Sequence, residues 1–217
     1  MSLWTEDGRD LMEVIEEIGH VPLPPYIRRL DAPPDRDRYQ TIYAHATGSV
    51  AAPTAGLHFT GALLEALRIA GVERTELTLH VGYGTFKPVR SERVEDHIVD
   101  PEPYLIDVDA AAAINRALDE RRRIVVVGTT TTRALESAAA QGAGRVTSSA
   151  SVAELFIYPG FNFRVTGALL TNFHLPRSSL LMLVSAFAGR ERVLKAYREA
   201  IARKYRFYSY GDAMLVV

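Results

Sequence analysis

Three histidines stand at positions where an imidazole could transfer protons to or from a bound substrate. His58 and His174 each have a phenylalanine neighbour and shortly precede a predicted helix, and His80 lies on the polar face of a predicted strand. Histidine suits general acid–base catalysis because its ordinary pKa is close to neutrality. The neighbouring rings, Phe59 and Phe173, offer aromatic faces that attract a cationic group. One histidine in such a place is usually a structural residue, but the repeated pairing favours a site.

The segment over residues 49–60 (SVAAPTAGLHFT) precedes a helix and contains few bulky side chains. Its proline and Gly56 give a tight backbone that can approach a ligand closely. Ser49 and Thr54 add hydroxyl groups, and the N–H groups at the start of the next helix favour negative charge. Two interpretations stay open: a loop that cradles a ligand, or a lead-in to the helix with Thr60 as its N-cap.

Two glycines, Gly82 and Gly84, follow a predicted strand and precede Thr85 and Phe86. This is not a dinucleotide-binding fingerprint, because the third glycine is absent and no helix begins after the turn. One interpretation is a tight turn that presents Thr85 and Phe86 to a ligand. In the other, the glycines serve only the turn.

The stretch over residues 128–133 (GTTTTR) links a predicted buried strand to a helix. Backbone N–H groups, the helix N-terminus, several hydroxyls and a guanidinium meet there, which predicts a site for a carboxylate or phosphate. The alternative is that one threonine caps the helix and Arg133 is solvated. We favour the anion site because a cap needs one hydroxyl and four are present.

Other kinds of site receive less support. The chain has no cysteine, which excludes disulfides, thiolate zinc sites, iron–sulfur clusters and cysteine nucleophiles. His97, Asp100 and Glu102 could bind a metal, but neither helical nor strand spacing brings them together, so we predict a charged loop and no metal. No nucleophile elbow supports serine-based hydrolysis.

The formal net charge is −1, so RNA binding would need a local basic patch. The best candidate is the cationic face of the predicted helix near the C-terminus. Its basic residues are Arg192, Lys195, Arg198, Arg203, Lys204 and Arg206. Such a face is more often merely solvated.

The elements that must position these residues alternate along the chain. Helices are predicted over residues 5–18, 109–122, 133–140, 179–187 and 190–205, and strands over residues 75–81, 123–127, 155–158, 169–171 and 213–217. A Gly/Ser/Thr-rich loop is predicted over residues 141–152. The alternation predicts one α/β domain over residues 1–217 with mostly parallel strands, for which a barrel-like closure is one arrangement. Without a signal peptide or a membrane-spanning run, we expect a cytoplasmic monomer that does not bind membranes.

Taken together, seven segments resemble the S-adenosylmethionine:tRNA ribosyltransferase-isomerase family of queuosine biosynthesis. They follow one another in the family's order and cover nearly the whole chain. The segments are GHVPLPPYIRR (19–29), DRYQTIYA (37–44), SVAAPTAGLHFT (49–60), LTLHVGYGTFKPV (77–89), VGTTTTRALES (127–137), LLTNFHLPRSSLLMLVSAFAG (169–189) and YRFYSYGDAML (205–215).

The resemblance implies the major domain of a larger two-domain protein. Family members are longer and begin with an N-terminal segment and a small β-barrel domain, whereas this chain starts inside the family pattern. Asp100 stands where the family often has a second histidine, so no role is carried over for that histidine.

The resemblance also implies an activity. The ribosyl part of S-adenosylmethionine is transferred to the aminomethyl group of a 7-deazaguanine base at the tRNA wobble position. The tRNA then carries epoxyqueuosine, and adenine and methionine leave. S-adenosylmethionine is a substrate, and no cofactor is implied. The alternative is a diverged, non-catalytic module that binds S-adenosylmethionine or RNA. A third possibility, a Rossmann-type methyltransferase, receives no support, because the chain lacks the acidic fingerprint that follows a strand in such enzymes.

This chemistry needs a base near the acidified carbon beside the sulfonium, a group that helps adenine depart, and an anion site for the methionine carboxylate. We assign His58, His80 and His174 to proton transfer or adenine departure. The predicted substrate-binding residues are Ser49, Thr54, Gly56, Phe59, Gly82, Gly84, Thr85, Phe86, Thr129, Thr130, Thr131, Arg133, Asn172 and Phe173. Among them, Phe59, Phe86 and Phe173 would contact the sulfonium or adenine, and the threonines with Arg133 would hold the carboxylate or a tRNA phosphate.

Overall fold

The computed structural model describes residues 4–5, 8–82, 84 and 87–217. Its α-helices are α1 (Leu11–Ile18), α2 (Pro33–Arg38), α3 (Gly61–Ile69), α4 (Val108–Asp119), α5 (Thr129–Gln141), α6 (Ser179–Ala188) and α7 (Arg190–Ala202). Its strands are β1 (Thr78–Leu79), β2 (Glu102–Ile106), β3 (Val125–Val127), β4 (Ser149–Ala153), β5 (Ala168–Asn172) and β6 (Ala213–Val216), with short 3-10 helices η1 (Thr54–His58) and η3 (Val94–Asp96). Thr85 and Phe86 lie outside the described residues, so their assignment stays a prediction.

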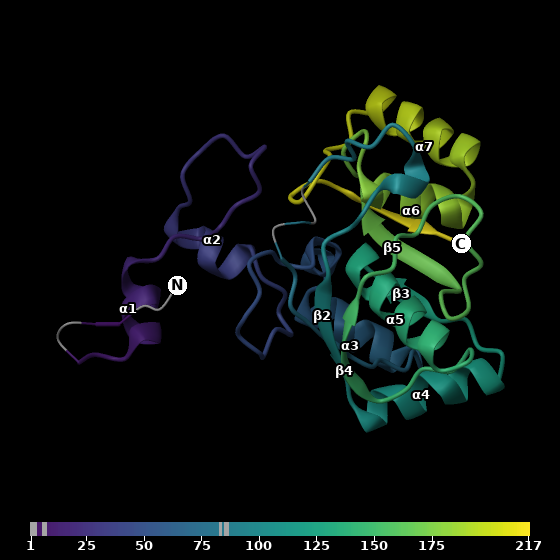
Figure 1. The fold of residues 1–217 in the computed structure, drawn as a ribbon, viewed down its shortest axis with the longest axis horizontal. Coiled ribbons are helices and arrows are strands. Elements are labelled where there is room, and N and C mark those ends of the chain that lie inside the picture. The colour runs from purple at the N-terminus through teal and green to yellow at the C-terminus, as the bar shows by residue number, and fades with distance from the viewer. Residues whose placement is uncertain (1–3, 6–7, 83, 85–86) are drawn as a thin grey trace.

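These elements form a mixed α/β fold, which confirms the predicted class (Figure 1). The strands make two three-stranded sheets, in the orders β1-β2-β4 and β3-β5-β6. Only β3 and β5 pair in parallel among the described strands; the pairings β1–β2, β2–β4 and β5–β6 are antiparallel. The expectation of mostly parallel strands therefore does not hold, and neither sheet closes into a barrel within the described part of the chain.

Strand β4 explains much of this difference, because it lies in the region predicted to be a loop. It runs antiparallel to β2, with Ser151 opposite Tyr104. Its sequence is SASVA, and only Ala153 within it is buried. A strand built from small and polar residues carries no alternating pattern of large apolar side chains. The strand predicted over residues 155–158 is not formed.

Helix α5 is the central element, because it contacts strands of both sheets. Its buried face includes Ala134, Leu135, Ala138 and Ala139, and the small alanines let other elements pack close to its axis. Helices α6 and α7 lie on the other side of β5 (Figure 1) and form a second core around Leu169. Burying a leucine side chain of this kind stabilises the fold by about 1.5–3 kcal/mol.

The threonine-rich segment is the first turn of α5 rather than a loop before it. The helix begins at Thr129, four residues earlier than predicted, because β-branched threonines have low helix propensity and hide the start. Gly128 precedes the helix with a φ of +94°, a backbone region that glycine adopts without strain. Thr60 is the N-cap of α3, which confirms that interpretation of the segment, and Ser178 is the N-cap of α6: each hydroxyl accepts a backbone N–H at 3.2 Å.

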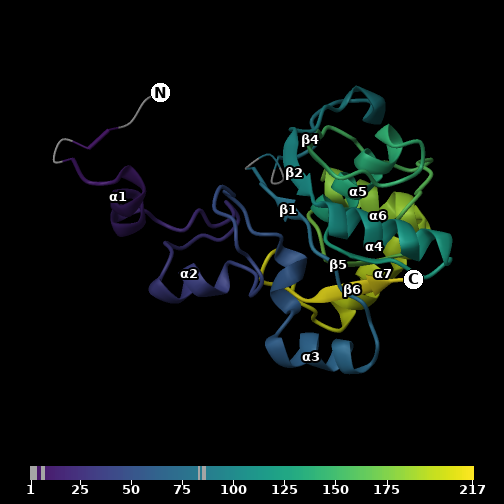
Figure 2. The same ribbon diagram turned by 90° about the horizontal axis from the view of Figure 1, so that it is seen from below.

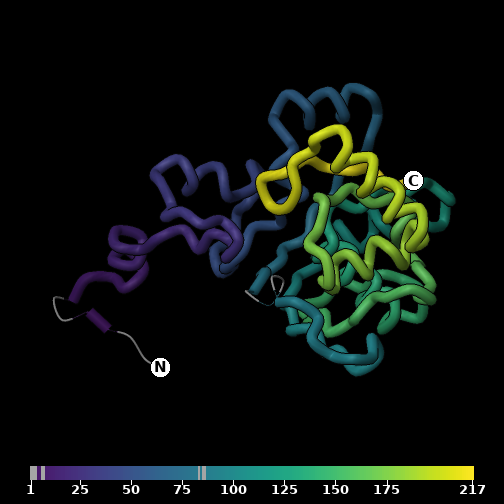
Figure 3. The backbone as a smooth tube through the Cα atoms, turned by 90° about the horizontal axis from the view of Figure 1, so that it is seen from above, coloured from purple at the N-terminus to yellow at the C-terminus, as the bar shows by residue number. Residues whose placement is uncertain are grey.

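Residues 8–48 form an arm that extends away from the two sheets (Figures 1 and 2). At its far end α1 is capped by Asp10, begins later than predicted, and has no buried residue. The arm is tied to the C-terminal segment, which lies beside it in Figure 3. Tyr26 shares a hydrogen bond with Ser209, and Asp35 accepts one from the Tyr210 hydroxyl at 3.0 Å.

Asp35 anchors this junction as a buried carboxylate. The Arg29 guanidinium donates two hydrogen bonds to it, at 2.6 and 2.8 Å, and holds the pKa of Asp35 well below its usual range. The pKa of Tyr210 is raised to about 12, mainly by burial and further by its hydrogen bond to Asp35 and the charge of that carboxylate. The arm is therefore held against the C-terminal loop by charge-assisted hydrogen bonds.

Candidate functional site

A cavity of about 440 Å³, which we call the first cavity, lies where the predicted segments come together. It is formed by the 52–55 loop, the start of α5, the end of β5 and the turn after it, and parts of the arm and the C-terminal loop. Its lining residues are Pro25, Tyr26, Ala52, Pro53, Thr54, Ala55, Val81, Lys87, Pro88, Gly128, Thr129, Thr130, Thr171, Asn172, Phe173, His174, Leu175, Pro176, Ser178, Leu180, Tyr208 and Ser209. The segments thus line one cavity.

The parallel pair β3–β5 places two of these segments side by side. Both strands end at the same edge of the sheet, where ligands commonly bind in α/β folds. Gly128 follows β3 and donates its N–H to the Leu170 carbonyl of β5 at 2.9 Å. The first turn of α5 and the Thr171–His174 segment therefore meet at this edge.

Asn172 organises the polar part of the first cavity. It is only 2% exposed, and its Nδ2 lies 3.1 Å from both the Tyr208 carbonyl oxygen and His58 Nε2. A carbonyl oxygen can only accept, so the amide nitrogen must face it, and Oδ1 accepts from the Thr54 hydroxyl at 3.4 Å. His58 Nε2 is then an acceptor, which places the proton of the neutral ring on Nδ1.

Both histidines at this site are neutral at pH 7. Burial lowers the pKa of His58, and the nearby Arg206 lowers it further, while Asp212 acts in the opposite direction. Burial lowers the pKa of His174 to about 4. His174 Nε2 lies 2.8 Å from the Thr171 hydroxyl, and its backbone N–H donates to the Tyr197 hydroxyl at 2.7 Å. His174 lines the first cavity, whereas His58 is connected to it through Asn172.

The two aromatic neighbours of these histidines differ, because Phe173 lines the first cavity and Phe59 does not. The Phe173 ring packs against Tyr197, Tyr205 and Phe207, with centroids 4.9–5.9 Å apart. Phe59 is not among the residues that line the first cavity.

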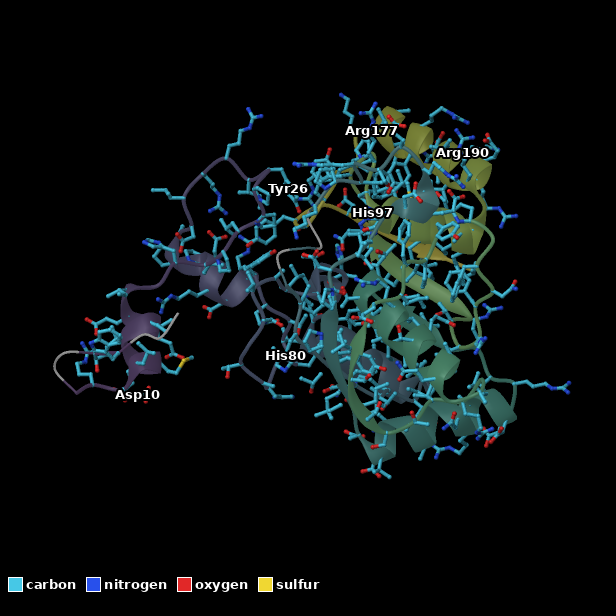
Figure 4. All side chains as sticks on the ribbon, viewed as in Figure 1. Asp10, Tyr26, His80, His97, Arg177 and Arg190 are labelled. Carbon is cyan, nitrogen blue, oxygen red and sulfur yellow. The ribbon has the colours of Figure 1, made fainter. Side chains whose placement is uncertain are left out.

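His80 lies apart from the other two histidines. It does not line the first cavity, and Figure 4 shows it at a distance from Tyr26, which does. A Cβ on Gly48 would lie 2.9 Å from the His80 ring, so the ring packs against that loop. The structure therefore does not bring His80 together with His58 and His174.

Several predicted ligand residues have structural partners instead. The Ser49 hydroxyl donates to the Leu79 carbonyl at 2.9 Å and accepts from the Val81 N–H at 3.0 Å. A Cβ on Gly56 would lie 2.3 Å from the Tyr43 hydroxyl, so this glycine is required by packing within the protein. Gly82 and Thr131 are also absent from the cavity lining.

Arg133 was expected to bind an anion, but its guanidinium is buried and most of its donors have partners within the protein. It donates to Glu102 at 2.7 Å and to the carbonyl oxygens of Asp100, Ala153 and Leu155 at 3.0–3.1 Å. Burial lowers the pKa of Arg133, and the charge of Glu102 raises it. Burial raises the pKa of Glu102, and the charge of Arg133 lowers it. Four of its five N–H donors are therefore used within the protein, and Arg133 fixes α5 to the first sheet.

A second cavity, also of about 440 Å³, lies beside the first. Its lining residues are Gly84, Lys87, Pro88, Arg90, Ser91, Asp96, His97, Ile98, Val99, Asp100, Glu102, Arg133, Ser179 and Leu180. It shares Lys87, Pro88 and Leu180 with the first cavity. Asp100 pairs with Lys87 at 2.6 Å. Most of its polar side chains are charged, unlike those of the first cavity.

Among the described residues no group of three or more metal-ligand side chains could hold a metal ion. The three candidates have separate partners: the His97 ring contacts Phe156, Asp100 pairs with Lys87, and Glu102 pairs with Arg133.

No helix in the described part of the chain is both long enough and apolar enough to span a membrane.

The cationic face on and after α7 is exposed, but its members differ. Arg203 pairs with Glu199 at 2.5 Å, and Arg206 pairs with Asp212 at 3.1 Å. The other predicted RNA-binding residues have no ion pair within the described ranges; these are Arg192, Lys195, Arg198 and Lys204.

Sequence reasoning missed the aromatic wall of the first cavity. Tyr26 comes from the arm and Tyr208 from the C-terminal loop, and their ring centroids are 5.0 Å apart. Both residues lie in motifs of the sequence, but no periodic pattern shows that segments about 180 residues apart meet. Only the packing of the arm reveals this wall.

Comparison with known proteins agrees with these motifs. A family model described as "Queuosine biosynthesis protein" matches residues 2–216. The S-adenosylmethionine:tRNA ribosyltransferase-isomerase of Thermus thermophilus is 59% identical over 208 residues, which is 96% of this chain and 59% of that protein. The protein of the same name from Syntrophotalea carbinolica is 53% identical, over 96% of this chain and 60% of its own length.

A solved structure is also similar. The S-adenosylmethionine tRNA ribosyltransferase of Thermotoga maritima superposes with a TM-score of 0.61 at 44% sequence identity. The match covers 75% of this chain and 51% of that one. The chain spans about 60% of the length of the curated relatives it matches.

Proposed function

The chain belongs to the family of queuosine biosynthesis proteins, and on this premise we propose that it transfers and isomerises the ribosyl group of S-adenosylmethionine. The acceptor is the 7-aminomethyl-7-deazaguanine base at the tRNA wobble position, and the products are epoxyqueuosine-tRNA, adenine and methionine. The observation that carries the proposal is the first cavity, where the start of α5, His174 and the His58–Asn172 pair meet.

The start of α5 is suited to the methionine carboxylate. Thr132 donates its N–H to the Gly128 carbonyl at 3.1 Å, so the three residues before it lie in the turn whose N–H groups have no acceptor within the helix. Thr129 and Thr130 line the first cavity. Free N–H groups and the helix dipole favour an anion there. In this proposal Arg133 is not a ligand, since it does not line the first cavity and its guanidinium is paired with Glu102.

The sulfonium would lie against the aromatic wall of the first cavity. Tyr26 and Tyr208 both line it, and tyrosine rings attract cations. These two rings take the place that the sequence suggested for Phe59, and Phe173 lines the same cavity.

Within this site we assign proton abstraction beside the sulfonium to His174. Its ring lines the first cavity and is unprotonated at neutral pH, so a nitrogen lone pair is available to a bound substrate; the low pKa makes it a weak base, which suits a carbon acidified by the adjacent sulfonium. His58 acts through Asn172, whose amide it fixes. A neutral imidazole that is locked by a hydrogen bond serves as a positioning group.

S-adenosylmethionine is consumed in this reaction, so the proposal needs no separate cofactor. The partner is a tRNA that bears the 7-deazaguanine precursor. We propose a monomer, and the chain's near-zero net charge leaves RNA contact to local groups.

The direct test is to incubate the protein with precursor tRNA and S-adenosylmethionine and to measure free adenine and methionine. The variant H174A should lower turnover about 10²–10⁴-fold, as expected for the loss of a general base. H80A is the matched control, because His80 lies outside the first cavity, and it should keep turnover. Near-normal turnover in H174A would remove His174 from the mechanism.

The positioning role of His58 has its own readout. H58A and N172A should each lower turnover, and the double variant should lose little more than either single one, because residues of one unit are not additive. Additive losses would mean that the two residues act separately.

The second candidate is a non-catalytic module that binds S-adenosylmethionine or RNA. Calorimetry that detects S-adenosylmethionine binding, together with no adenine released in the presence of precursor tRNA, would establish this alternative.

A further inference from the structure

The two cavities share a wall made of two loops that are joined through their backbones. Val89 donates its N–H to the Arg177 carbonyl at 2.9 Å, and Pro88 bridges to Ser178 in antiparallel fashion. Lys87 and Pro88 of one loop line both cavities. The two loops therefore form one hydrogen-bonded wall between the cavities.

Each loop carries an exposed arginine beside this wall. Arg90 lines the second cavity, and Arg177 stands between Pro176 and Ser178, which line the first. Neither arginine has an ion pair within the ranges that the structure describes. Figure 4 shows Arg177, Tyr26 and His97, another lining residue of the second cavity, in the upper part of the view. Two unpaired cations thus flank the junction of the cavities.

The interior of the second cavity offers groups that recognise a nucleobase. The Ser91 hydroxyl is buried and has no hydrogen-bond partner among the described residues, and a buried polar group normally has one. The His97 ring packs edge-on against Phe156 with centroids 4.9 Å apart, and such rings stack on unpaired bases. The Asp96 and Asp100 carboxylates can accept hydrogen bonds from exocyclic amino groups.

From these observations we propose that the second cavity receives an unstacked base of the RNA substrate and that Arg90 and Arg177 bind the phosphates beside it. This inference rests on the proposed function and assigns the acceptor side of the same site. A base in the second cavity would lie next to the substrate in the first, separated only by the wall that carries Lys87. Single-stranded RNA is recognised in this way, through splayed bases and charged contacts to the backbone.

The cationic face of α7 is the rival surface. It carries exposed positive charge, but its residues do not line either cavity, and Arg203 and Arg206 already have acidic partners. A solvated helix face can attract RNA without placing a base beside the other substrate. The arginines beside the wall could both attract RNA and hold a base next to the other substrate.

The test measures binding of a synthetic RNA stem–loop by fluorescence anisotropy over a range of salt concentrations. The variant R90Q/R177Q should weaken binding about tenfold, since hydrogen bonds to charged groups are individually strong. It should lower the slope of log affinity against log salt by about 1.4, because two single-strand phosphate contacts are lost. R90K/R177K should retain most of the affinity, and thermal melting checks that every variant is folded.

Three comparisons complete the experiment. R192Q/R198Q removes charge from the rival face, and R121Q/R123Q removes the same charge from the end of α4, as the matched control. A loss confined to R90Q/R177Q supports the proposal. Unchanged binding in R90Q/R177Q overturns it, whether or not the α7 variant loses affinity, and so does a blunt-ended duplex that binds as tightly as the stem–loop.

The same variants separate this inference from the proposed function. S-adenosylmethionine binding, measured by calorimetry, should be unchanged in R90Q/R177Q because these side chains lie outside the first cavity. If the wild-type protein binds the stem–loop through the two arginines but releases no adenine with precursor tRNA, the activity fails and the RNA site stands. If adenine is released while R90Q/R177Q binds RNA normally, the activity stands and the RNA site fails.

Discussion

The two cavities have the same volume but opposite chemistry. The first is lined mainly by small and apolar side chains, with two tyrosines and a neutral imidazole. The second contains the buried pair Arg133–Glu102 and the exposed pair Lys87–Asp100. Burial keeps the histidines uncharged on one side of the wall, and paired charges fill the other side. This division suits the proposed reaction, in which a cationic cosubstrate and a polyanionic one would bind on opposite sides of the wall.

The largest expected effect on stability concerns the buried ion pair Arg133–Glu102, which lines the second cavity. Arg133 and Glu102 have side chains only 9% and 4% exposed. R133M should lower the free energy of unfolding by about 3–5 kcal/mol, because it leaves a buried carboxylate unpaired. Chemical denaturation followed by circular dichroism measures this.

The double variant R133M/E102L provides the control. It removes both charges and should recover part of the stability, since buried ion pairs are often replaceable by apolar groups. Recovery stays partial because the carbonyls of Asp100, Ala153 and Leu155 lose their donor. If R133M is as stable as the wild type, the second cavity does not depend on this pair, and the contrast between the cavities weakens.

The next effect tests the neutral character of the first cavity through pH. The pKa of His174 is about 4 in the folded protein against 6.5 in the unfolded chain, so the unfolded chain binds more protons between these values. His174 therefore contributes stability in full above pH 6.5, and about 2–3 kcal/mol of it is lost as pH falls toward 4. H174Q should remove this part of the pH dependence, while H80Q should leave it in place. Identical slopes in H174Q and wild type would mean that the ring is not held neutral by burial.

A smaller effect concerns the loop that closes the first cavity. G56A places a Cβ 2.3 Å from the Tyr43 hydroxyl and 2.6 Å from Thr41 Cγ2. Overpacking of this kind costs about 1–3 kcal/mol, and we expect a matching loss in thermal stability. G56A/Y43F removes the closer contact and should recover part of the loss. A variant G56A that melts like the wild type would show that this loop adjusts freely and does not shape the cavity.

Much of the fold could be read from local sequence signals. The N-caps Thr60 and Ser178, the apolar helix α6 and the final strand follow from capping residues and hydrophobic runs. Strand β4 could not be predicted, because SASVA contains almost no apolar side chain to mark its pairing with β2. The start of α5 was placed late because threonine is a poor helix former that tertiary burial overrides here.

The candidate site divides in the same way. Local motifs predicted His58, Asn172, His174 and the threonines after β3 as site residues, because each lies after a predicted strand or before a predicted helix. They did not reveal that Arg133 would form an ion pair with Glu102, since these residues are 31 positions apart in the sequence. Nor did they reveal the Tyr26 wall, which exists only because the arm folds back onto the C-terminal loop.

The smallest expected effect concerns Lys87, the cation on the wall between the cavities. Its ion pair with Asp100 has side chains 58% and 43% exposed, so solvent screens it and K87M should change stability by less than about 1 kcal/mol. R133M is the comparison. The two ion pairs have similar lengths and line one cavity, but their contributions to the free energy of unfolding should differ severalfold because only one pair is buried. Denaturation curves of K87M and R133M, recorded at low and high salt, make the comparison. Only the K87M difference should shrink with salt. A large, salt-independent loss in K87M would mean that the wall itself depends on this lysine, and that the two cavities are one structural unit rather than two.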